Sequence, residues 1–451
     1  MASYAKDFIA QSINDYKYQR LNAKRKEIEC YIDFYSGTSI GEYIKPYFDA
    51  IPFQEVPVYE MNITKKFINK MSKIYTLGAI RNSVKKYQDY TKKKDVAFKH
   101  IERMTRLLGT LATQVTYEKD KFCYHPIYFF IPHFLPSDPL NPVAITYPLL
   151  PPYDDPTYTE GIEAFAYVDV DQYIEYDKSG NIVKEEFHNL GRMPIVFTHR
   201  EHQIDSFFVE GANDIINCNK HVNITLTEMQ LGLRYQMFGQ PFATGVPEAD
   251  MTARAGSDMI ISLPEGATYG IASPGGNLMS VIDALKFQIE LVAQSNHMYV
   301  QFAQDGGETP SGIALQIKDL ESYEDYKDDI EFWRRYEDDF YEVERLVGAP
   351  YGVKLPNKFS VDFKEPEYPK SEMEKIQRDD WDLKNGQTTL AEIMVRNNKD
   401  ITLEEAEQKI EANLEKNVSQ LTSFLPPQLQ NNDESNGEES EIDKDAGSRR
   451  D

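Results

Sequence analysis

The amino-acid sequence predicts an α+β chain that is mainly helical. Two long segments, 213–238 and 278–302, repeat apolar residues every three or four positions, as helices that bury one face do. Residues 110–197 instead alternate apolar and polar side chains between turn residues, which is typical of strands. The chain has 451 residues. At about 150 residues per domain, we expect roughly three structural units.

The N-terminal part is predicted to begin with helices and to continue with strands. Segments 21–35 and 63–75 carry apolar residues at helical spacing and end at or near a glycine. The residues Asp177-Lys178-Ser179-Gly180 join two alternating runs and predict a β-hairpin. The most apolar stretch, 127–135, is far shorter than the roughly 18 residues of a membrane-spanning helix, so we interpret it as a buried strand or ordered loop.

The middle of the chain is predicted to form a long helix, a compact β unit and a second long helix. The β unit occupies 239–277, where short apolar runs alternate with turn residues. A Gly-containing loop follows at 304–311, and Ser311 is a suitable N-cap for a helix that continues to about residue 346. This helix carries many acids between aromatic residues. We expect its acidic face to be solvated or to line a channel, and its aromatic face to pack on a large partner.

The C-terminal part is predicted to contain a strand at 358–363, a small helical module at about 371–417 and a disordered tail. Three capping-box pairs mark the starts of helices in the module: Ser371 with Glu374, Thr389 with Glu392, and Thr402 with Glu405. From Pro426 onward the composition is polar and acidic, with almost no apolar residues to support a core.

The charge and cysteine content exclude several classes of protein. The chain has 49 Lys and Arg against 73 Asp and Glu, a net charge of -24. This balance argues against tight, non-specific wrapping of a phosphate backbone, which requires cations. Cys30, Cys123 and Cys218 are far apart and odd in number, so they predict neither a disulfide framework nor a zinc site. The N-terminus lacks the apolar core of a signal peptide, and the default location is a reducing cytosol.

Motifs for catalysis are missing from the sequence. There is no GxxxxGK[ST] phosphate loop and no GxSxG nucleophile turn. The cluster His199-Arg200-Glu201-His202 matches neither HExxH nor HxxEH, and we favour a structural or solvated role for it. We therefore expect no catalytic residues, no cofactor and no metal. A metal-dependent hydrolase centred on His199 and His202 remains an alternative.

Several short motifs occur in a specific order along the chain. They are DFYSG at 33–37 followed by NITK at 62–65, GRMPIVF at 191–197 leading through Glu210-Gly211, SGIAL at 311–315, and KNGQTT at 384–389 with ITLEE at 401–405. Each motif alone is weak. Together with the order of the predicted elements, they resemble the portal proteins of tailed double-stranded-DNA bacteriophages over residues 15–417.

The resemblance implies a division of the chain into the regions of a portal subunit. The regions are a wing at 1–207 and 312–370, stem helices at 208–238 and 278–303, a clip at 239–277, a tunnel loop at 304–311, a crown at 371–425 and a disordered acidic tail at 426–451.

The resemblance also implies roles for individual residues. The tunnel loop and its end comprise Asp305, Gly306, Gly307, Glu308, Thr309, Pro310, Ser311 and Gly312. The residues expected to pack the stem helices together are Val222, Leu226, Met229, Leu233, Val281, Leu285, Ile289 and Val292. The clip residues expected to contact the terminase or connector proteins are Arg254, Asp258, Glu265 and Tyr269. The tunnel loop has no lysine, so its sequence gives no reason to expect that it binds the phosphates of DNA.

The resemblance implies a homo-oligomeric ring of twelve copies at one capsid vertex of the virion, assembled in the host cytoplasm. The ring would be the channel for DNA packaging by the terminase and for DNA ejection, and the docking site for head-to-tail connector proteins. Its implied partners are the major capsid and scaffold proteins, the terminase large subunit, head-to-tail connector proteins and double-stranded DNA, which would pass through without tight binding; no membrane is implied. An acidic channel wall suits such a conduit because it repels phosphates. The alternative is a non-catalytic phage structural adaptor or scaffolding module without a DNA channel.

Overall fold

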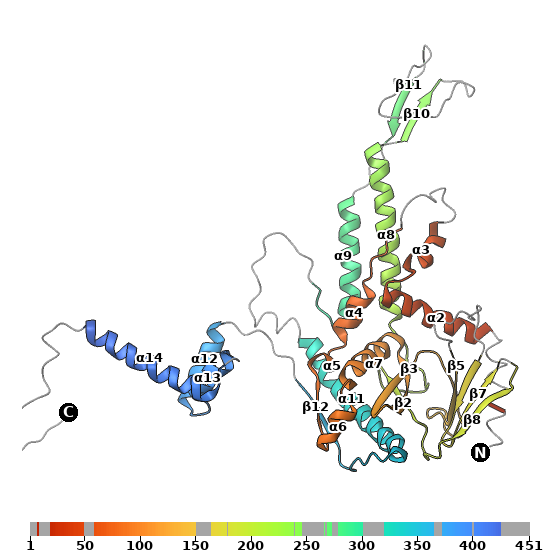
Figure 1. The fold of residues 1–451 in the computed structure, drawn as a ribbon. Coiled ribbons are helices and arrows are strands. Elements are labelled where there is room, and N and C mark those ends of the chain that lie inside the picture. The colour runs from red at the N-terminus through yellow and green to blue at the C-terminus, as the bar shows by residue number, and fades with distance from the viewer. Residues whose placement is uncertain are drawn as a thin grey trace, which may run out of the picture. The chain divides into compact units, whose positions relative to one another are not determined.

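The computed structural model describes residues 7–8, 19–48, 58–149, 164–177, 179–238, 240–245, 266, 268–272, 278–300, 320–364, 372–398 and 401–424. The chain divides into two compact units, Met1–Glu367 and Tyr368–Asp451. Helices and strands are both present in the first unit, and helices alone are described in the second (Figure 1). The expected α+β class is confirmed.

The body of the first unit contains the helices α2 (Gln19–Ser36), α3 (Ile40–Phe48), α4 (Thr64–Met71), α5 (Ile74–Leu77), α6 (Lys85–Tyr90), α7 (Lys94–Leu108) and α11 (Leu320–Gly348), and the 3-10 turn η2 (Ala349–Tyr351). The long helix α11 packs against α5 and η2. The main hydrophobic core includes Phe98 and Ile101 of α7 and Trp333 and Phe340 of α11. The predicted aromatic face of the long helix is therefore confirmed, and its partner is the same chain.

Three antiparallel sheets complete the body of this unit. One has the order β3-β2-β9, formed by β2 (Thr110–Glu118), β3 (Lys121–Ile127) and β9 (Ile195–His199). Another has the order β4-β5-β6-β7-β8, formed by β4 (Ile131–His133), β5 (Ala144–Leu149), β6 (Ala164–Val168), β7 (Gln172–Asp177) and β8 (Ile182–Phe187). A two-stranded sheet pairs β1 (Ala79–Asn82) with β12 (Ser360–Phe363), so residues about 280 positions apart lie side by side.

The predicted hairpin between β7 and β8 is confirmed. The Asp177 carboxylate accepts hydrogen bonds from the backbone N–H groups of Ser179 and Asn181, at 2.8 and 2.9 Å. Gly180 has a φ of +85°, a conformation that a residue with a Cβ rarely adopts. The turn residues thus explain the hairpin directly.

The predicted single helix at 63–75 is wrong, because the structure breaks it into α4 and α5. The Ser72 hydroxyl donates to the Ile68 carbonyl at 2.8 Å where α4 ends. The buried Glu102 carboxylate then accepts the backbone N–H groups of Ile74 and Tyr75, at 3.0 and 3.2 Å. A distant side chain therefore caps the new helix, which a local apolar period cannot reveal.

The two long helices predicted in the middle of the chain are both present. α8 spans Asn213–Phe238, as predicted, and α9 spans Leu278–Ser295. The predicted end at 302 is too late: the Met298 N–H turns back to the Ala293 carbonyl at 2.8 Å, and His297 has a φ of +49°. Between the helices, β10 (Gln240–Thr244) pairs with β11 (Thr268–Ala272), in agreement with the predicted β unit.

The second unit contains α12 (Glu372–Lys384), α13 (Leu390–Asn397) and α14 (Leu403–Phe424). The capping boxes at Thr389 and Thr402 are confirmed by reciprocal hydrogen bonds with Glu392 and Glu405. Ser371 lies outside the described residues. The last helix continues beyond the predicted end at 417.

Candidate functional site: the helical projection and its anchor

The most distinctive feature of the first unit is a pair of long helices joined by a β-hairpin. The chain leaves the body along α8, forms the hairpin β10–β11 and returns along α9, which packs beside α8 (Figure 1). We call this arrangement the projection.

The predicted stem residues lie along both helices at different depths. Val222 and Leu285 belong to the main core, and Leu226, Ile289 and Val292 pack against it. Met229 and Val281 are half-buried, and Leu233 is 40% exposed. On other faces of α9, Met279, Phe287 and Leu291 are exposed. The projection therefore presents apolar side chains that the described part of this chain does not cover, and such surfaces commonly mark contact sites.

Other predicted site residues fall largely outside the described part of the chain. All eight residues from Asp305 to Gly312 do so, and so do Arg254, Asp258 and Glu265. Tyr269 lies in β11, opposite Ala243 of β10. Their predicted roles stay predictions.

A row of buried polar side chains fastens α8 to the body. Asn223 receives a hydrogen bond from the Met61 N–H at 2.7 Å and donates one to the Met61 carbonyl at 2.9 Å. Thr227 accepts the Tyr59 N–H at 3.1 Å, one turn further along. These side chains satisfy backbone groups of a segment that belongs to no helix or strand. We call the pairing of Asn223 and Thr227 with residues 58–62 the polar seam.

The polar seam was not predicted from the sequence. Asn219, Asn223 and Thr227 recur every four residues on one face of α8, and all three are buried. That spacing is the signal that reveals such a feature, because buried amides require partners.

Polar contacts also fix the lower end of α9. Asn296 donates to Asp214 of α8 at 2.6 Å and accepts from Arg200 at 3.1 Å. His297 pairs with Asp325 of α11, with 2.6 Å between Nδ1 and the carboxylate oxygen. This ion pair therefore links the segment before residues 301–319 to the helix that follows them.

The ion pair between His297 and Asp325 predicts a pH dependence. The hydrogen bond to Asp325 raises the pKa of His297, so the pair stabilises the fold fully below the usual histidine pKa of about 6.5 and loses its effect as pH rises through the raised value. The His297→Asn variant should therefore have a lower thermal midpoint than the wild type at acidic pH and an equal one at alkaline pH. The effect is modest because both side chains are partly exposed. His202→Asn, at an exposed histidine, is the control and should show no such convergence.

Buried charges hold α11 against the rest of the body. Lys94 lies 3.0 Å from Glu337 and 2.7 Å from Glu344, and all three side chains are fully buried. Arg81 also pairs with Glu337, and Tyr87 donates to Glu344 at 2.7 Å. Burial alone would raise the pKa of Glu337, but Lys94 and Arg81 outweigh it and hold that pKa below its usual value.

These contacts correct the expectation of a solvated acidic face. For Glu337 and Glu344 that expectation is wrong, because the side chains point into the body toward cations from β1 and α7. An acid on the buried face of a helix is stable only where a cation reaches it. In this chain the cations come from more than 240 positions earlier.

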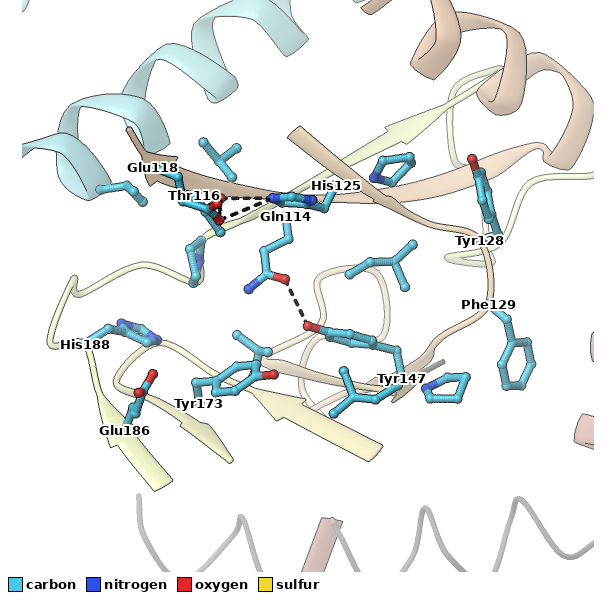
Figure 2. Close-up of a pocket in the computed structure, with 18 of the residues that line it drawn as sticks. Gln114, Thr116, Glu118, His125, Tyr128, Phe129, Tyr147, Tyr173, Glu186 and His188 are labelled. Atoms are coloured by element: carbon cyan, nitrogen blue, oxygen red, sulfur yellow. Dashed lines mark hydrogen bonds and ion pairs between the residues drawn. The ribbon is translucent and has the colours of Figure 1, made fainter. Parts of the chain in front are cut away.

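A cavity of about 1030 Å³ lies between the three-stranded and five-stranded sheets (Figure 2). Gln114 and His125 line its upper wall, and Tyr147 and Tyr173 line its lower wall. Tyr147 donates to Gln114 across it at 2.9 Å. These residues come from four strands, so no sequence motif marked the cavity.

His125 contacts two side chains in this cavity, the Thr116 hydroxyl and, at 3.9 Å, the Glu118 carboxylate (Figure 2). Thr116 donates its hydroxyl proton to Glu118 at 3.1 Å. The Thr116 oxygen can then only accept a hydrogen bond from the Nε2–H group of His125, with 3.0 Å between the two atoms. A base that activates a hydroxyl must accept its proton instead. The hydrogen bond therefore runs from the His125 ring to the Thr116 hydroxyl, which is the reverse of its direction in a pair of nucleophile and general base.

The two histidines of the sequence cluster have different surroundings. The Nδ1 atom of His199 lies 3.1 Å from the Thr110 hydroxyl, and its ring packs against Phe207. Burial lowers the pKa of His199 to about 4. His202 is exposed. Within the described residues, no group of three or more His, Cys, Asp or Glu side chains is arranged to hold a metal ion.

Comparisons with known proteins give a distant likeness. No protein-family model matches the sequence, and no curated protein matches it. Among solved structures, the fold is similar to a chain described as "Virion of native gene transfer agent (GTA) particle", with a TM-score of 0.35 and 9% sequence identity, over 72% of this chain and 85% of that one. Helices long and apolar enough to cross a membrane were sought among the described residues, and none was found.

Proposed function

We propose that the chain is the subunit of a portal-like ring, a non-catalytic conduit for double-stranded DNA at a capsid vertex. The observation that carries this proposal is the projection: two long helices linked by a β-hairpin, rooted in an α+β body whose long helix α11 follows α9 in sequence. This is the order of elements by which the sequence resembles portal proteins. The partners are then the terminase, capsid and scaffold proteins, and connectors.

The regions of a portal subunit agree with the order of elements in this chain. α8 and α9 correspond to the stem, and β10–β11 belongs to the clip. The second unit begins at Tyr368, close to the expected start of the crown at 371. Residues 301–319, between α9 and α11, contain the expected tunnel loop.

Physical considerations support a ring with a repelling channel. Closure of a ring requires two different complementary faces on each subunit. The exposed apolar residues Met279, Phe287 and Leu291 of α9 are suited to one such face. A net charge of -24 opposes a tight grip on phosphates, so DNA could slide through a channel built from such a chain.

Electron microscopy of the purified protein tests the proposal. We expect rings of about a dozen copies with an axial hole wider than roughly 20 Å, the diameter that duplex DNA with its grooves requires. The imaging should be repeated with the scaffold protein present, since ring closure can depend on it. Compact particles without a hole under both conditions would contradict the conduit and favour the structural adaptor.

A further inference from the structure

Positive charge is concentrated in one segment of this acidic chain. Residues 64–121 contain fifteen Lys and Arg against five Asp and Glu, although the whole chain carries a net charge of -24. An asymmetry of this size within one chain commonly marks a surface for a polyanion. The structure shows which of these cations remain available.

Three of the cations are used inside the body. Arg81 and Lys94 pair with the buried carboxylates of α11 described above. Arg106 pairs with Asp329, also of α11. Their role is to hold that helix, so they do not contribute to a binding surface.

Four exposed lysines lie together at α6 and the start of α7. They are Lys85, Lys86, Lys92 and Lys93. Among these four, the ion pairs found in the described part of the chain involve Lys92 alone, which lies 3.4 Å from Asp89. The charge of the group is therefore largely uncompensated.

The turn between β2 and β3 brings two more lysines to the same region. Tyr90 of α6 packs edge-on against Tyr117 and Phe122 of this hairpin, with ring centroids 6.3 Å apart in each case. The tight turn carries Lys119 and, next to it, Lys121, both exposed. We define the lysine surface as Lys85, Lys86, Lys92, Lys93, Lys119 and Lys121. The exposed acids beside it are Asp89, Glu118 and Asp120.

We propose that the lysine surface binds the phosphate backbone of nucleic acid. Its cations are long, flexible and exposed, as contacts that follow a backbone without reading bases are. Neither cavity found in the described structure is lined by these six side chains, so a small anion has no enclosed site there. Lysine is also depleted at protein–protein interfaces, which favours phosphates over an acidic protein.

This binding goes beyond the proposed conduit. A channel wall must let DNA slide, whereas the lysine surface would hold nucleic acid weakly from outside the projection. Figure 1 shows α6 at the end of the body away from α8 and α9. Because the rest of the chain is acidic, the binding should be weak and strongly dependent on salt.

Fluorescence anisotropy with a labelled duplex DNA of random sequence tests the proposal. The full-length protein is titrated at several KCl concentrations, together with a variant that carries Lys85→Gln, Lys86→Gln, Lys92→Gln and Lys93→Gln. We expect the variant to bind at least about tenfold more weakly at low salt. The slope of log K against log salt should fall by about 3 to 4, close to one for each phosphate that the variant no longer neutralises.

A matched variant separates this local effect from the removal of four charges. It carries Lys26→Gln, Lys65→Gln, Lys66→Gln and Lys409→Gln, at exposed lysines outside the lysine surface. Equal reductions of affinity in the two variants, or no binding of duplex DNA by the wild type at low salt, would overturn the proposal. The proposal would also be overturned if polyglutamate displaced the DNA as well as unlabelled DNA of the same total charge does. That result would identify an acidic protein as the partner. Unchanged thermal midpoints establish that both variants are folded, and none of these readouts depends on ring formation.

Discussion

Replacing Lys94 by Met will lower the free energy of unfolding of the first unit by about 3–5 kcal/mol, the usual result of removing one partner from a buried ion pair. Lys94 contacts Glu337 and Glu344, and no other cation is paired with Glu344 within the described residues. Met keeps most of the volume of the lysine stem but none of its charge. The change therefore isolates the loss of the cation from the loss of packing.

Lys93→Met is the control, because that residue precedes Lys94 and is exposed. It should change the stability by less than about 0.5 kcal/mol, as surface substitutions usually do. The two variants are compared by urea unfolding monitored through the tyrosine-rich core, together with the thermal midpoint. If Lys94→Met differs from the control by less than about 1 kcal/mol, the buried charges do not hold α11 in place.

The stability of the Lys94→Met variant, measured at acidic and at alkaline pH, tests the cause of its instability. Lys94 helps to hold the pKa of Glu337 below its usual value, so that pKa should rise when the cation is removed. The variant should then lose more stability at alkaline pH than at acidic pH, because the pairing of Glu337 with Lys94 stabilises the fold only while the carboxylate is ionised. A loss that is equal at both pH values would indicate a packing defect instead.

Local signals in the sequence were sufficient for many elements of the fold. The apolar period of 213–238 gave α8 with its bounds, and Asp177 with Gly180 gave the hairpin. The capping box at Thr389 gave the start of α13. In each case the residues that determine the element lie within a few positions of one another.

Features that depend on distant residues were not predictable. The break between α4 and α5 requires Glu102, and the buried acids of α11 require Arg81 and Lys94. The cavity between the two sheets is assembled from strands that no motif connects. Of the predicted site residues, the stem positions and Tyr269 are described, and the predicted tunnel loop lies in a part of the chain that the structure does not describe.

Two of the short sequence motifs acquire a physical meaning in the structure. Asn62 donates to the Tyr35 carbonyl at 3.1 Å and accepts the Lys65 N–H at 2.9 Å, so it joins the end of α2 to the start of α4. A Cβ at Gly37 would lie 2.8 Å from the Asn62 amide nitrogen. The glycine of DFYSG and the asparagine of NITK are therefore parts of one junction.

Replacing Asn223 by Leu will detach segment 58–62 from α8. The Met61 N–H and carbonyl lose their partners together. Met61 is 43% exposed, so water replaces part of each lost hydrogen bond and the cost stays near the low end of the usual range for such losses. Leu is somewhat larger than Asn, so a cavity does not contribute. We expect the stability to fall by about 1–2 kcal/mol, and hydrogen exchange at Met61 to become at least about tenfold faster.

Asn217→Leu provides a matched control on the same helix. Asn217 is exposed and bonds only to Asn213 among the contacts described, so its replacement should leave exchange at Met61 unchanged. If Asn223→Leu destabilises the protein but leaves that exchange rate unaltered, the seam does not anchor the segment, and the loss reflects strain from the larger side chain. Faster exchange confined to 58–62, with α8 itself still protected, would show that the helix stands without the seam and that the seam serves to fix α4 and α2 to the base of the projection.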